Sequence, residues 1–161
     1  MHEVIILIAK YCVAVPVLVY AYVLLKTTPE QRVRVFVRAV LAAIITAVLI
    51  KIATTLHQDA RPFVRDGVHP YFSSSTDNGF PSDHTALSAL LGFIVLLQRK
   101  RLGIGLLALS ILIGTARVVA GVHHGQDIIG GFVIAGVGVG LAALLVRYIA
   151  PFMRKKSQET T

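Results

Sequence analysis

Long apolar runs separated by short polar segments dominate this chain. Five runs approach or exceed the roughly 20 residues that a helix needs to cross a bilayer. They cover residues 4–25, 35–57, 83–98, 103–120 and 126–149. The third and fourth runs are the shortest, so their limits are the least sharply marked. The pattern predicts an all-α, polytopic membrane bundle of about five transmembrane helices.

Basic residues gather between alternate apolar runs. The clusters are Lys26, Arg32, Arg34 and Arg38; Arg99, Lys100 and Arg101; and Arg147, Arg154, Lys155 and Lys156. Because cytoplasmic loops carry an excess of Lys and Arg, we place all three clusters inside. An odd number of spans then puts the N-terminus outside, together with loop 58–82 and the connection 121–125, and the C-terminus inside.

Composition agrees with one membrane-embedded domain over residues 1–161, with a core at 34–149 and a cytoplasmic tail at 150–161. Of the 161 residues 55% are hydrophobic and 15% are charged, and the mean hydropathy is +0.74. The basic excess is spread over helix edges, which argues against nucleic-acid binding. We expect residues 1–25 to be a retained helix, since they lack the features of a removable signal peptide. Cys12 is the only cysteine, which excludes an internal disulfide and a Cys-rich metal site.

Three polar clusters fall at the predicted outer ends of the spans. They are Arg61-Pro62, then Pro81-Ser82-Asp83-His84, then Arg117 with His123 and Asp127. Guanidinium groups bind phosphate oxygens in a bidentate way, while one imidazole can attack phosphorus and another can protonate the leaving oxygen. Asp127 follows His123 by four residues, so on a helix its carboxylate could fix the imidazole tautomer. Ser82 and the backbone N–H groups beside it, that of Asp83 included, would add donors for an anion.

These elements resemble the signature of the PAP2 family, the type 2 phosphatidic acid phosphatases. The family pattern combines Lys-x6-Arg-Pro, Pro-Ser-x-His and Arg-x5-His-x3-Asp, and the resemblance covers roughly residues 51–127. Phe80-Pro81-Ser82-Asp83-His84, with Asp where most of the family has Gly, is similar to the bacterial undecaprenyl-diphosphate phosphatases associated with bacitracin resistance. The family lysine would fall at Thr54, whereas the nearest lysine is Lys51, three residues earlier. Lys51 could point the same way from one helical turn deeper.

The resemblance implies a cofactor- and metal-independent lipid phosphatase of a bacterial cytoplasmic membrane, with its site on the extracytoplasmic face. His123 would form a phosphohistidine, His84 would be the general acid and later the base, and Asp127 would orient His123. Arg61, Arg117 and Ser82, with Asp83 and Lys51, would hold the phosphate. The family fold commonly has six membrane helices, so one is expected to be missing or supplied by a partner.

Other interpretations remain open at this point. The substrate could be undecaprenyl diphosphate, phosphatidic acid or phosphatidylglycerophosphate. A metal-dependent hydrolase, a non-catalytic membrane subunit and a channel are the alternatives from other classes. Gly136 and Gly140 favour close helix packing and are compatible with a homo-oligomer. The loop residues His57, Asp59, Arg65, Asp66 and His69 receive no site assignment, because solvent exposure explains polar residues in a loop.

Overall fold

The fold is that of a computed structural model, of which residues 1–159 are described, and every helix or strand assigned within them is helical. The helices are α1 (His2–Tyr11), α2 (Ala14–Leu25), α3 (Pro29–Leu56), α4 (Pro62–Arg65), α5 (Asp83–Leu96), α6 (Lys100–Val119) and α7 (Gly125–Glu159). Residues 1–159 also contain an isolated antiparallel β-bridge, between Ala60 and Asn78. The predicted all-α fold class is therefore confirmed.

The number of membrane spans was predicted to be about five. By length and composition, three helices could each cross a membrane: α3, α6 and the Gly125–Tyr148 part of α7. Helices α1 and α2 form a fourth candidate together, bent by 43° at their junction. Helix α5 has 14 residues and falls short of the roughly 20 that a span requires. The apolar helices are those of a multi-pass membrane protein, but a count of five is not confirmed.

Helices α3 and α7 extend beyond the predicted spans. Helix α3 begins at Pro29 instead of residue 35, because proline lacks the N–H group that the first helical turn leaves unpaired. Helix α7 continues to Glu159, through most of the segment that the sequence predicts to be a tail. Residues 160 and 161 of that tail lie outside the described residues.

Small residues let the helices approach closely. Helix α5 packs against α2, α3, α6 and α7, and alanines supply five of the eight buried residues in the main cluster between α3, α5 and α7. Gly138 of α7 lies directly against Thr46 of α3, leaving no room for a Cβ atom. Large apolar side chains such as Leu18, Phe36 and Leu144 point outward and are exposed, which suits contact with lipid chains.

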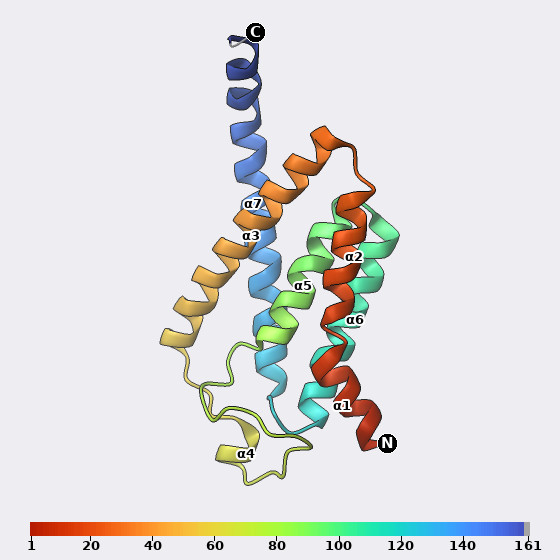
Figure 1. The fold of residues 1–161 in the computed structure, drawn as a ribbon. Helices are drawn as coiled ribbons and strands as arrows, with labels where there is room; N and C mark the ends of the chain where they lie inside the picture. Colours follow the sequence, from red (N-terminus) through yellow and green to blue (C-terminus); the bar gives the residue numbers. More distant parts are fainter. Residues whose placement is uncertain (160–161) are drawn as a thin grey trace.

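The connections sort to two opposite ends of the bundle (Figure 1). The N-terminus, α4, the end of α3, the start of α5 and the α6–α7 turn lie at one end. The α2–α3 and α5–α6 connections lie at the other end, and α7 extends toward that end. All three predicted polar clusters therefore meet at one end, opposite the basic connections.

Candidate active site

A glycine turn after α6 brings His123 back beside the end of its own helix. Gly121 has a φ of +73°, a left-handed conformation that costs glycine little and other residues more. The Val122 N–H donates to the Arg117 carbonyl at 3.2 Å, and the Gly121 N–H donates to the Val118 carbonyl at 3.0 Å. This pair of bonds is the Schellman motif that ends helices. The turn leads from the end of α6 to His123 and on to the start of α7.

His123 is buried, and its two ring nitrogens face opposite charges. Nδ1 lies 3.0 Å from Oδ2 of Asp127. Nε2 lies 3.3 Å from Nη1 of Arg61 and 3.3 Å from Nη2 of Arg117. Since the carboxylate requires a proton on Nδ1, Nε2 carries the free lone pair. The structure thus brings together four residues that the sequence singled out, from three separate segments.

Arg61 is held in place by the loop before α5. Its Nη1 donates to the Val122 carbonyl at 3.1 Å, while Nη2 pairs with Oδ1 of Asp77 at 2.8 Å. Ser75 donates to the same Asp77 oxygen at 2.6 Å. The arginine is 7% exposed, so these bonds fix its orientation. Nothing in the sequence singled out Ser75 and Asp77, because their links to Arg61 span 14 and 16 residues.

Arg117 reaches the same point from α6. It is 5% exposed, and its Nη1 donates to the carbonyl of Ala9 in α1 at 3.0 Å. Its Nε has no hydrogen-bond partner among the described residues. A buried donor without a partner is costly, so Arg117 retains capacity to bind an anion. The contact with Ala9 also places the end of α1 against the site.

Burial decides the charge of His123. The pKa of His123 is lowered by desolvation; the hydrogen bond to Asp127 opposes this shift, and the charges of Arg117 and Arg61 add to it. The ring is therefore neutral at pH 7, with a lone pair on Nε2. By contrast, the pKa of the Asp77 carboxyl is lowered by its hydrogen bonds with Ser75 and Arg61, so it stays ionised beside the guanidinium group.

The residues at the start of α5 are placed less directly. His84 is half-buried on the first turn of α5. Ser82 is fully buried; its N–H donates to the Asp127 carbonyl at 3.0 Å, and its hydroxyl accepts from Thr85 at 3.2 Å. Ser82 therefore ties α5 to the first turn of α7. The Asp83 side chain is exposed.

Lys51 is not brought to the His123 group, which we define as His123, Asp127, Arg61 and Arg117. It is exposed on α3, and its ammonium makes no ion pair with the residues that the structure describes. Thr54, at the position of the family lysine, instead donates its hydroxyl to the Phe80 carbonyl at 3.2 Å. This bond links α3 to the segment before α5.

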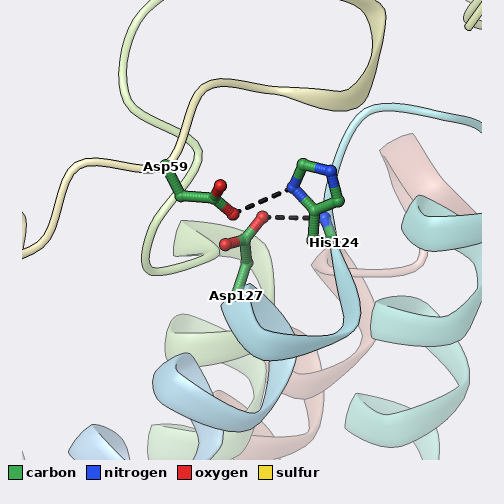
Figure 2. A group of neighbouring side chains, drawn as sticks. All are labelled: Asp59, His124 and Asp127. Carbon is green, nitrogen blue, oxygen red and sulfur yellow. Dashed lines mark hydrogen bonds and ion pairs between the residues drawn. The ribbon is translucent and has the colours of Figure 1, made fainter. Parts of the chain in front are cut away.

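A second polar group, formed by Asp59, His124 and Asp127, lies beside the first (Figure 2). One possible ligand atom from each residue lies within 4.8 Å of the others, a spacing that could hold a metal ion. Nδ1 of His124 is 2.9 Å from Oδ2 of Asp59, and the His124 N–H donates to Oδ2 of Asp127 at 2.8 Å. These bonds already join the three residues, so we describe the group as a hydrogen-bonded cluster. Asp59 is 4% exposed, which contradicts its interpretation as a solvated loop residue.

Comparisons with known proteins show the family and the fold. The crystal structure of Aquifex aeolicus LpxE superimposes with a TM-score of 0.66, covering 86% of this chain and 80% of that chain at 23% identity, which shows a shared fold. Over 131 residues the chain is 36% identical to the bacitracin transport permease protein BcrC of Bacillus licheniformis; the match covers 81% of this chain and 62% of that protein's length. It is 26% identical to the undecaprenyl-diphosphatase BcrC of Bacillus subtilis (strain 168), over 84% of this chain and 69% of that protein. Residues 33–151 match the family model of the PAP2 superfamily. The chain belongs to the PAP2 superfamily.

Proposed function

We propose that the chain is a membrane phosphatase that removes the terminal phosphate from a lipid diphosphate, with undecaprenyl diphosphate as the preferred substrate. The observation that carries the proposal is Nε2 of a neutral, buried His123, which lies 3.3 Å from each of two guanidinium groups and accepts from them. An anion that replaces these contacts would be gripped by Arg61 and Arg117 directly beside a nucleophile. The name of the Bacillus subtilis relative supports the choice of lipid.

The reaction would proceed through a phosphohistidine. Nε2 of His123 attacks the terminal phosphorus and the bond from phosphorus to the bridging oxygen breaks. The lipid monophosphate leaves after taking a proton from His84, whose protonated form the negative charge of the bound diphosphate stabilises. His84 then removes a proton from water, which attacks phosphorus, breaks the P–N bond and releases inorganic phosphate. Asp127 keeps the proton on Nδ1 and stabilises the positive charge that the ring acquires.

The placement of the site suits a lipid substrate in a bacterial cytoplasmic membrane. The segments that carry Arg61, Arg117, His123 and Asp127 meet at one end of the bundle. Many side chains on the outside of the bundle are apolar. The basic connections lie at the opposite end, and an excess of Lys and Arg marks the cytoplasmic side. We therefore assign the site and the N-terminus to the extracytoplasmic face and the C-terminus to the cytoplasm.

A substrate panel tests this proposal. Purified protein in detergent, with a strong chelator present, is assayed for phosphate release from undecaprenyl diphosphate, phosphatidic acid and phosphatidylglycerophosphate. We expect release in the chelator, fastest with the diphosphate. Faster turnover of a monophosphate substrate would reassign the lipid, while activity that disappears with the chelator and returns with a divalent ion would contradict the metal-independent mechanism.

The nucleophile is tested by His123→Ala. We expect this variant to fold in detergent but to release no phosphate and to form no acid-labile phosphoenzyme. His69→Ala is the matched control, because His69 is an exposed loop residue, and it should keep the activity of the wild-type protein. Normal turnover by His123→Ala would refute the assignment of the nucleophile.

A further inference from the structure

Asp59 joins the segments that carry the proposed catalytic groups. Its Oδ2 lies 2.9 Å from Nδ1 of His124 and accepts from Nε2 of Gln126 at 2.7 Å. Its Oδ1 accepts from Nη1 of Arg65 at 2.8 Å. His124 and Gln126 lie between His123 and Asp127 in the chain, so one carboxylate is bonded to two positions of the turn that presents the nucleophile.

The backbone of Asp59 is fixed as firmly as its side chain. Its N–H donates to Oδ1 of Asn78 at 2.8 Å, and its carbonyl accepts from the Gly79 N–H at 2.8 Å. A Cβ atom on Gly79 would lie 3.2 Å from the Asp59 carbonyl oxygen and 3.2 Å from Oδ2 of Asp127. The lack of a side chain at Gly79 thus allows the 78–80 segment to pass close to both Asp59 and Asp127. Two residues after Asp59 the chain places Arg61 against His123.

We propose that Asp59 is a positioning residue of the active site, holding the His123 turn and Arg61 in one fixed arrangement through His124, Gln126 and the 78–79 backbone. The inference rests on the phosphatase function proposed above. A displacement of reacting groups by about 1 Å can reduce a rate by about 100-fold. A buried carboxylate that spans the two loops is suited to prevent such a displacement.

The charge of Asp59 strengthens this link. Desolvation acts to raise the pKa of Asp59, but the hydrogen bonds from Gln126 and His124 and the charge of Arg65 outweigh it, and the pKa lies below its ordinary value. The residue is therefore ionised at neutral pH, and its hydrogen bonds are charge-assisted. Such bonds are about twice as strong as neutral ones.

The experiment measures kcat and KM for undecaprenyl diphosphate, together with inhibition by inorganic phosphate. Asp59→Asn has nearly the same size and loses the charge, so we expect kcat to fall by about 10- to 100-fold. KM and the phosphate inhibition constant should change much less, because Arg117 still binds the anion. Asp66→Asn is the matched control: Asp66 contacts the other ring nitrogen of His124, at 3.0 Å, but is exposed. We expect its kcat to match that of the wild-type protein.

A double-mutant cycle separates positioning from general stability. If Asp59 acts through the turn, then Gln126→Ala should also lower kcat, and the double variant Asp59→Asn/Gln126→Ala should lose less than the product of the two single effects.

Equal losses of kcat in Asp59→Asn and Asp66→Asn, or strictly multiplicative effects on kcat in the double variant, would overturn the proposal. So would a wild-type kcat in Asp59→Asn. Should Asp59→Asn fail to fold, an unchanged kcat in Gln126→Ala overturns it as well. Wild-type protein that is inactive on the whole panel would instead refute the proposed function.

Discussion

Replacing Asp127 with asparagine removes one charge next to the nucleophile and leaves its shape almost unchanged. Oδ2 of Asp127 accepts from His123 at 3.0 Å and from the His124 N–H at 2.8 Å, while Oδ1 is buried without a hydrogen-bond partner in the described structure. An asparagine that turns its NH2 group toward the ring would force the proton onto Nε2 and block attack. Turned the other way, its NH2 group would occupy the position of Oδ1 and lack an acceptor.

Both consequences can be expressed as free energies. The lost charge-assisted hydrogen bond is worth about 1.5–3 kcal/mol, and the unpaired donor or wrong tautomer costs about 1–3 kcal/mol. Together they correspond to a loss of kcat of about 10²- to 10⁴-fold, since about 1.4 kcal/mol equals a factor of ten. The KM should change little, because Asp127 does not face the phosphate.

The assay for Asp127→Asn is phosphate release from the lipid diphosphate, with single-turnover formation of the phosphoenzyme as a second readout. Both rates should fall together, because Asp127 acts on the attacking ring. Thermal unfolding in detergent controls for folding, and Asp66→Asn controls for loss of a nearby carboxylate. A kcat within about threefold of the wild-type value, a difference below about 0.7 kcal/mol, would refute the orienting role.

Three further predictions follow from the structure. The acid limb of the kcat/KM profile should lie below pH 6.5, because the pKa of His123 is lowered from that value and activity is lost as falling pH protonates the ring. A midpoint above 6.5 would contradict the argument that burial keeps His123 neutral. Gly138→Ala should lower the unfolding free energy in detergent by about 1–3 kcal/mol, because the added Cβ atom would collide with Thr46. Gly140→Ala is the control and should have little effect, since nothing lies within 4 Å of a Cβ atom added there. Lys51→Ala should change kcat/KM by no more than about twofold, because Lys51 is exposed and outside the His123 group; a loss of 100-fold would show that it binds the substrate.

Local sequence features predicted the parts of the site that lie on one short segment. Arg117, His123 and Asp127 span eleven residues, and the backbone bonds of one helix end and one helix start place them together. Five residues separate Arg117 from His123, and a glycine in the left-handed region reverses the chain there. Such spacing is a property of the chain itself, which is why it can be recognised without a fold.

The apolar runs likewise determined that the chain forms membrane helices, because burial of apolar surface depends on composition over a window of residues. The limits of those helices were less predictable. The 43° bend between α1 and α2 lies just before Pro16, which has no N–H to donate to the carbonyl of Cys12 and so breaks the helix there. Helix α5 ends after 14 residues, at Leu96. Hydropathy averages over such local features.

The resemblance to the PAP2 family already predicted that Arg61 joins His123, but only the tertiary structure decided how it does so and which other distant residues take part. Arg61 contacts it across 62 residues, and Asp59 contacts His124 across 65, whereas Lys51 stays outside. Contacts at such separations depend on how closely α3, α5 and α7 approach, which glycine and alanine positions control. Loop polarity alone gave no reason to expect Asp59 to be buried, because burial of a carboxylate is tolerated only where donors converge from other segments, and the fold alone supplies those donors.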